Sequence, residues 1–140
     1  MLRLVAFDVG EKRIGIAVSD PLGITAQGIE TYQRTGEPER DVSHLLEIAN
    51  RYRPAKLVFG MPRNMDGSYG RQAELTKAFA ESVLARWDGD SAFWDERLTT
   101  MSAQRVLLEA DVRRNKRKNV IDKLAAVVIL QSYLDANGAV

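Results

Sequence analysis

Three acidic residues, Asp8, Glu96 and Asp122, stand where a carboxylate could do chemistry. Asp8 ends an apolar row of a predicted strand, Glu96 follows another predicted strand, and Asp122 lies near the start of the last predicted helix. Ionised carboxylates seldom occupy such positions unless a cation, a metal or hydrogen-bond donors compensate for lost hydration. If the three converge, a hard divalent cation would neutralise their repulsion. Two such cations, about 4 Å apart, can activate water and stabilise the leaving oxygen in phosphodiester hydrolysis.

Each of these acids also has a purely structural interpretation. Asp8 could cap the turn that follows it, and Glu96 could belong to a surface ion-pair cluster after a strand. Asp122 follows Asn119 at the spacing of a capping-box variant, and the helix dipole favours an acid in a first turn. Position alone therefore leaves both the metal site and the structural roles open.

The elements that must position the acids follow from the spacing of apolar residues. Residues 2–20 predict two strands, and the charged turn between them is too short for a crossover, so the pair should be an antiparallel hairpin. Further strands and helices follow from short apolar runs and from helical stripes. The predicted strands are 2–9, 14–19, 24–32, 56–60 and 91–95; the predicted helices are about 36–52, 72–87, one beginning near 99 or 100, and about 120–136.

This order of elements predicts an α/β fold with a mixed sheet. A three-stranded meander comes first, and strands then alternate with helices, so the first, fourth and fifth strands should be parallel and helices should cover both faces. The carboxyl ends of parallel strands are where open α/β sheets place their sites. Asp8 lies at one such strand end and Glu96 directly follows another, and a helix packed across that edge could bring Asp122 to them. Residues 1–140 are expected to form one domain.

Composition narrows the class of protein further. The chain is 45% hydrophobic and 28% charged, as ordinary soluble globular proteins are. It has no cysteine, which excludes a disulfide framework and thiolate chemistry. No apolar run approaches the roughly 20 residues that span a bilayer. The first residues lack the order of a signal peptide, because charged residues interrupt them, so a cytoplasmic location is expected.

Basic residues gather in one run although the formal net charge is only +1. A local basic patch is compatible with nucleic-acid binding along the phosphate backbone, whereas a solvated loop is the alternative. The run consists of Arg113, Arg114, Lys116, Arg117 and Lys118.

Two further basic residues, Lys12 and Arg13, lie in the predicted hairpin turn, where they could hold a phosphate or form a solvated tip.

Four stretches of the chain together form a specific pattern: FDVGEKRIGIAVSDPLGITAQ, FGMPRNMDGSYG, WDERLTT and KRKNVIDKLAAVVILQSYLD. In these stretches the chain resembles the YqgF/RuvX family, which has an RNase H-like fold. The stretches appear in family order and spacing, and they span nearly the whole chain. The resemblance implies a five-stranded mixed sheet in the order 3-2-1-4-5. It also implies that Asp8, Glu96 and Asp122 form an acidic triad that binds Mg²⁺ or Mn²⁺, with two ions expected.

Members of that family are described as Holliday junction resolvases and as nucleases that mature the 5′ end of pre-16S ribosomal RNA. The resemblance therefore implies metal-dependent phosphodiester hydrolysis, with pre-rRNA or branched DNA as partner. A resolvase would act as a homodimer to cut two strands symmetrically, whereas RNA-end processing allows a monomer. Two alternatives stay open: a phosphotransferase, because the hairpin also resembles the phosphate-binding hairpin of the actin, sugar-kinase and Hsp70 group, and a non-catalytic nucleic-acid or ribosome-assembly factor.

Overall fold

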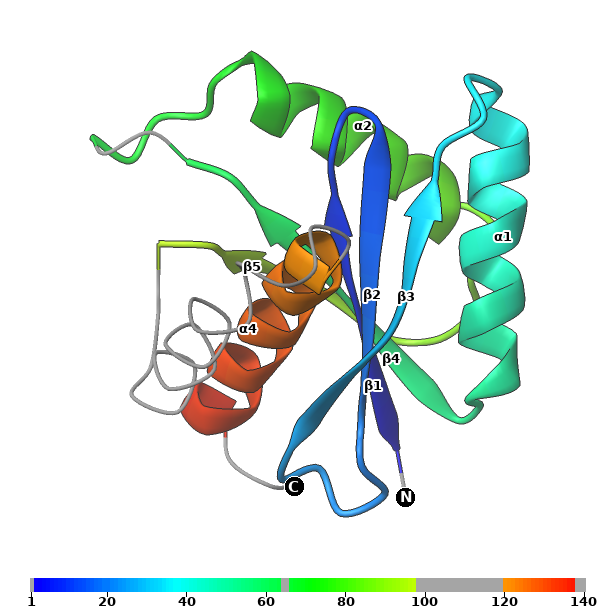
Figure 1. Ribbon diagram of the computed structural model, residues 1–140, viewed down its shortest axis with the longest axis vertical. Coiled ribbons are helices and arrows are strands. Elements are labelled where there is room, and N and C mark those ends of the chain that lie inside the picture. The colour runs from blue at the N-terminus through cyan, green and yellow to red at the C-terminus, as the bar shows by residue number, and fades with distance from the viewer. Residues whose placement is uncertain (1, 64–65, 98–119, 138–140) are drawn as a thin grey trace.

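The computed structural model describes residues 2–63, 66–97 and 120–137, except for the side chains of 120–122. Within these residues the chain forms one five-stranded sheet and three helices (Figure 1). The elements are β1 (Arg3–Val9), β2 (Arg13–Ser19), β3 (Ala26–Gln33), α1 (Pro38–Arg51), β4 (Ala55–Met61), α2 (Arg71–Leu84), β5 (Ser91–Asp95) and α4 (Val120–Asn137).

The strand order is β3-β2-β1-β4-β5, which confirms the predicted topology. β1 pairs antiparallel with β2 and parallel with β4, and β4 pairs parallel with β5. The short turn after β1 produces the hairpin, whereas the return from β1 to β4 passes through α1, as a parallel pair requires. The carboxyl ends of β1, β4 and β5 therefore lie at one edge of the sheet.

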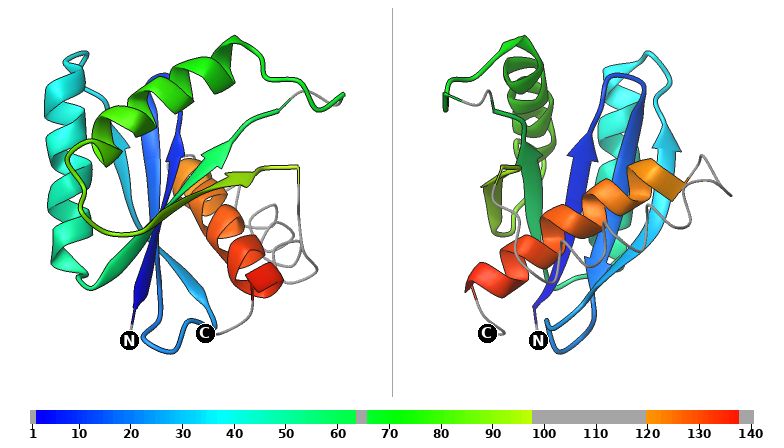
Figure 2. Two further views of the ribbon diagram at one scale, coloured as in Figure 1. Left: turned by 180° about the vertical axis from the view of Figure 1, so that it is seen from behind. Right: turned by 60° about the vertical axis from the view of Figure 1, so that its left-hand side comes forward.

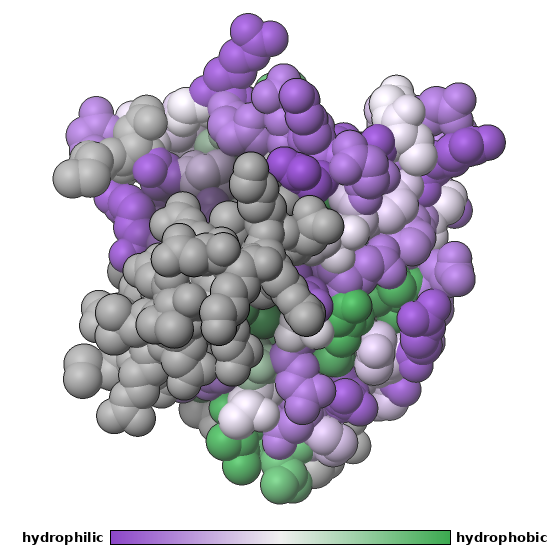
Figure 3. Space-filling view, in the orientation of Figure 1, coloured by the Kyte–Doolittle hydropathy of each residue, from purple (hydrophilic) through white to green (hydrophobic). Residues whose placement is uncertain are grey.

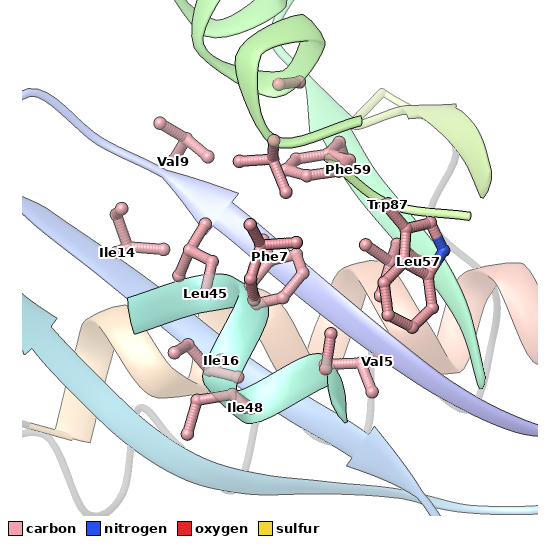
Figure 4. Close-up of a cluster of buried hydrophobic side chains, with 14 of the residues drawn as sticks. Val5, Phe7, Val9, Ile14, Ile16, Leu45, Ile48, Leu57, Phe59 and Trp87 are labelled. Carbon is pink, nitrogen blue, oxygen red and sulfur yellow. The ribbon is translucent and has the colours of Figure 1, made fainter. Parts of the chain in front are cut away.

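Helices lie on both faces of the sheet (Figure 2), and a hydrophobic layer is buried on each face. α1 and α2 cover one face, where alternate residues of β1 such as Val5 and Phe7 pack with Leu45 and Phe59 (Figure 4). α4 covers the other face and packs on residues such as Ala6. Because side chains of a strand alternate between faces, Asp8 lies on the α4 side with Ala6. The helices on both faces confirm the predicted layers.

One detail of the predicted core is wrong. The spacing of apolar residues in α2 predicts that Leu75 belongs to its buried stripe, but 54% of Leu75 is exposed. A repeat of four residues drifts around a helix that has 3.6 residues per turn. The buried face instead runs through Ala73, Thr76 and Ala80, and it keeps the predicted Phe79 and Val83. The predicted helix near 99 or 100 lies outside the described residues.

The surface is mostly hydrophilic on the side shown in Figure 3, and hydrophobic side chains gather in small areas of its lower half. Among exposed large hydrophobic residues are Leu22 and Ile24, which lie between β2 and β3, at the end of the sheet remote from Asp8. None of the helices in the described part of the chain has the length and apolarity to cross a membrane.

Candidate active site at the carboxyl edge of the sheet

The side chains of Asp8 and Glu96 meet at the carboxyl edge of the sheet. Asp8 is the penultimate residue of β1, and Glu96 directly follows β5. The backbone N–H of Glu96 donates to the carbonyl of Met61 at 3.2 Å, so the pairing of β5 with β4 extends to this residue. The two carboxyl groups share a hydrogen bond. The structure thus brings together two of the three predicted acids.

A glycine on the intervening strand allows this contact. β4 separates β1 from β5, and neighbouring strands lie about 4.8 Å apart, so the two acids must reach each other across β4. A β-carbon on Gly60 would lie 3.2 Å from Cγ of Glu96 and would also crowd Ile129 of α4. On the other side of Asp8, its cross-strand partner on β2 is Gly15. Asp8 therefore has residues without side chains beside it on both neighbouring strands.

Burial and the charge of Asp8 dominate the electrostatics of the pair. Burial of Glu96, repulsion from Asp8 and their shared hydrogen bond together raise the pKa of Glu96 to about 8. The protonated carboxyl of Glu96 then donates to the carboxylate of Asp8 near neutral pH. Carboxylate oxygens are the ligands that hard divalent cations prefer, and a cation would relieve the repulsion of the pair when both are ionised. The donor set fits a divalent metal ion.

The third predicted acid is placed only by its backbone. Asp122 lies in the first turn of α4, and α4 covers the same face of the sheet that carries Asp8 and Glu96. Its side chain is outside the described residues. No group of three or more potential metal ligands is found among the residues that the structure describes. The three-acid site therefore stays a prediction.

The neighbouring acid, Asp95, has a different role from that of Glu96. Its carboxylate accepts from Nη2 of Arg97 at 2.7 Å, and Nη1 of Arg63 lies 3.7 Å away. The hydrogen bond from Arg97 is the main reason that the pKa of Asp95 is lowered. The surface ion-pair cluster considered for this segment thus involves Asp95, whereas Glu96 turns to Asp8.

Arg34 holds the hairpin turn beside Asp8 through hydrogen bonds to two backbone carbonyls. Gly10 donates to the carbonyl of Arg13 at 2.9 Å, and a β-carbon on Gly10 would lie 2.7 Å from that oxygen, so the turn requires glycine. Nη1 of Arg34 donates to the Gly10 carbonyl at 3.0 Å, and the backbone N–H of Arg34 donates to the carbonyl of Lys12 at 2.9 Å. Arg34 thereby fixes the turn that follows the candidate active-site strand.

Arg34 is itself held by Asp41, a buried carboxylate of α1. The exposed fraction of the Asp41 side chain is 1%, and its Oδ2 accepts from Nε of Arg34 at 3.2 Å. Oδ1 accepts from the Tyr32 hydroxyl at 2.9 Å and from the N–H and hydroxyl of Thr35 at 3.1 and 3.0 Å. This network could not be predicted from the sequence, because nothing in the local pattern marks Asp41 as buried.

The Asp41 network predicts a loss of stability in acid. Burial raises the pKa of Asp41, but hydrogen bonds from Thr35, Tyr32 and Arg34 outweigh it and hold the pKa below its ordinary value. A lowered folded-state pKa stabilises the protein above the unfolded value of about 3.9, and this contribution is lost as pH falls through the folded-state pKa. We expect the urea unfolding free energy of wild type to fall more steeply below pH 4 than that of Asp41→Asn. Equal slopes would contradict the prediction.

Gly60 provides a test of the contact between the acids. Gly60→Ala is expected to displace the Glu96 side chain, because the new methyl group would press on its Cγ, and to lower any metal-dependent cleavage by about tenfold or more. The cost in stability should be about 1–3 kcal/mol because Ile129 is crowded as well. Turnover and urea unfolding, measured on one preparation, separate the two effects. Unchanged turnover in a folded variant would contradict the role of Gly60.

The predicted nucleic-acid-binding residues are only partly described. Lys12 lies in the turn between β1 and β2, and Arg13 is the first residue of β2. Lys12 also lines a cavity of about 400 Å³ together with Glu11 and Arg34. The basic run lies outside the described residues: Arg113, Arg114, Lys116, Arg117 and Lys118. Binding of nucleic acid by these side chains stays a prediction.

Comparison with solved structures identifies the fold as RNase H-like. The chain is similar to the RuvC of T. thermophilus in complex with a Holliday junction substrate, with a TM-score of 0.63, 14% identity, and 99% and 98% of the two chains covered. It is also similar to the Fowlpox virus resolvase in complex with Holliday junction DNA, with a TM-score of 0.60, 12% identity, and 97% and 99% covered.

Sequence comparison then gives the family. A profile described as "RuvX: Holliday junction resolvase" matches residues 2–136. A relative from Symbiobacterium thermophilum is 54% identical over 99% of this chain and 95% of its own length, and one from Clostridioides difficile is 52% identical over 95% and 94%. Both carry the name "Putative pre-16S rRNA nuclease". The chain belongs to the RuvX family, whose members are enzymes that hydrolyse phosphodiester bonds.

Proposed function

We propose that this chain is a divalent-metal-dependent nuclease that processes the 5′ end of pre-16S ribosomal RNA. The observation that carries the proposal is the contact between Asp8 and Glu96 at the carboxyl edge of the sheet. The names of relatives about half identical to this chain favour ribosomal RNA as the substrate. Residues 1–140 act as one nuclease domain in this proposal.

The carboxylates of Asp8, Glu96 and Asp122 hold Mg²⁺ or Mn²⁺, with two ions expected. Bound metal ions would supply Lewis acidity for attack of water on the phosphodiester bond. Asp8 anchors the site because its strand lies at the centre of the sheet. Glu96 completes the shell from β5 across Gly60, and α4 brings the backbone of Asp122 to the same face.

Basic side chains hold the nucleic acid over the acids. Lys12 lies in the turn after β1 and Arg13 begins β2, where both can contact a phosphate next to the scissile bond. The basic run from Arg113 to Lys118 binds the RNA backbone in this proposal. Such contacts are independent of sequence and weaken as salt rises.

Resolution of Holliday junctions is the second candidate, favoured by the description of the matching family. It would require a homodimer that places two sites on symmetric strands, whereas RNA processing is open to a monomer. A non-catalytic role in ribosome assembly is the remaining alternative.

Cleavage assays distinguish these functions. The full chain is offered single-stranded RNA that contains a 16S 5′ extension, linear duplex DNA and a four-way DNA junction, each with Mg²⁺, Mn²⁺ or EDTA. Metal-dependent cleavage of the RNA alone supports the proposal. Cleavage of the junction alone favours the resolvase, and RNA binding without cleavage under every metal condition overturns the nuclease assignment.

A further inference from the structure

A second cavity lies at the same edge of the sheet, on the face opposite the two acids. It has a volume of about 340 Å³ and lies between β4, β5, α2 and the segment before α2. This volume is at the small end of the range for ligand cavities, which is about 300–1,000 Å³. Its lining residues are Met61, Tyr69, Ala73, Glu74, Lys77 and Phe93.

Two exposed aromatic rings form part of the cavity wall. Phe93 is 41% exposed although it lies on a strand, and Tyr69 is 52% exposed. Phe93 pairs with Phe59 across β4 and β5, and the ring centroids lie 6.1 Å apart, so the inner side of Phe93 rests on the core. Arg63 lies over the Tyr69 ring, with Cζ 4.2 Å from its centroid. Both rings are thus supported by neighbours while they remain accessible.

The polar residues of the cavity provide complementary hydrogen-bonding groups. Glu74 and Lys77 of α2 line it, so the wall of the cavity includes a carboxylate acceptor and an ammonium donor. An unpaired nucleobase offers a ring face for stacking and an edge with donors and acceptors, which matches this combination. A purely apolar ligand would offer no hydrogen-bonding partner to Glu74 and Lys77.

The cavity adjoins the candidate active site across the edge of the sheet. Met61, which lines the cavity, pairs with Asp95 and accepts the backbone hydrogen bond of Glu96. An RNA strand that passes from the acids to the cavity must cross this edge of the sheet. Arg63 and Arg97 flank Asp95 there. Guanidinium groups on that path suit the phosphates between the two sites.

We propose that this cavity binds one unstacked base of a single-stranded RNA while a phosphodiester bond of the same strand lies at Asp8 and Glu96. The proposal rests on the proposed nuclease function for the second half of that statement. It specifies the substrate class, because a base within a duplex is stacked and paired and cannot enter the cavity. Phe93 and Tyr69 are specificity-determining residues in this arrangement.

Binding measured without cleavage tests the cavity separately from the chemistry. The full chain is titrated in EDTA against a fluorescent single-stranded RNA and against copies that carry one abasic nucleotide at successive positions. Phe93→Ala and Phe93→Leu should each weaken binding about tenfold, because stacking on the ring is lost. Leu22→Ala, an exposed hydrophobic residue at the far end of the sheet, is the matched control and should bind like wild type. Thermal unfolding verifies that each variant is folded.

A double-mutant cycle locates the base. At one RNA position the abasic substitution should weaken wild type about tenfold and leave Phe93→Ala unaffected. Affinities within twofold of wild type for both Phe93 variants would overturn the proposal, as would additive effects at every position. The proposal would also be overturned if the Phe93 variants lost as much affinity for a fully paired four-way DNA junction as for the RNA. A change in oligomeric mass with Phe93→Ala would overturn it as well. RNA binding through Phe93 without any cleavage would overturn the nuclease function and leave the base cavity standing.

Discussion

Asp8→Asn and Glu96→Gln should each reduce metal-dependent cleavage by at least about 100-fold. The reason is that each substitution removes ligand oxygens and negative charge from a site where metal ions supply several kcal/mol of transition-state stabilisation. Either substitution also removes the cost of holding two acidic groups together in a buried site, where one of them must stay protonated near neutral pH, so the thermal unfolding midpoint should stay the same or rise. Lost activity together with retained or increased stability is the signature of a functional site.

The matched control is Glu47→Gln on α1, an exposed acid whose carboxylate lies 3.7 Å from Arg51. It makes the same chemical change far from the acids and should alter neither turnover nor stability. Single-turnover rates with saturating Mn²⁺ compare the variants directly. Rates within threefold of wild type for both Asp8→Asn and Glu96→Gln would remove these residues from the active site.

Asp41→Ala is expected to be among the most destabilising polar substitutions in the described part of the chain. It leaves the guanidinium of Arg34 partly buried without its carboxylate, and loss of one partner of a buried pair costs about 3–5 kcal/mol. The thermal unfolding midpoint should fall by roughly 10 °C. Activity should fall as well, even where the variant is fully folded, because Arg34 holds the carbonyl of Gly10 beside the active-site strand.

An exposed ion pair at the start of the same helix serves as the comparison. Glu37 and Arg40 are 3.1 Å apart with side chains that are 67% and 72% exposed, so Glu37→Ala should change stability little. Urea unfolding of the two variants, followed by cleavage assays at a temperature where both are folded, completes the test. Similar unfolding free energies for Asp41→Ala and Glu37→Ala would show that the buried network contributes nothing.

The sheet could be predicted from the sequence because its strands obey local rules. The alternation in residues 3–9, the short charged turn and the later strand–helix alternation each restrict the topology, and the structure follows the predicted order. Leu75 shows where a pattern fails, because a spacing of four residues fits two neighbouring helical faces equally well in a short segment. Only packing against the sheet decides which face is buried.

The candidate site was partly predictable, because the order of the strands places Asp8 and Glu96 at the carboxyl ends of parallel strands. The contact between the two acids, however, depends on Gly60, and the role of Gly60 appears only when the three strands lie side by side. The burial of Asp41 and the cavity beside Phe93 depend on residues distant in sequence. Periodicity describes one element at a time, so it cannot reveal such features.

The coverage of the sheet by α4 has a consequence for synthesis of the chain on the ribosome. The side chain of Gln131 bonds to the N–H of Ala26 and the carbonyl of Ile24, each at 3.1 Å, and 105 residues separate Gln131 from Ala26. At about 5–20 residues per second, the early hairpin waits roughly 5–20 s for this helix. Until then the apolar face around Ala6 lacks its cover. Asp122 is made with the helix that closes this layer, so a nascent chain acquires its complete core and the last proposed acid together.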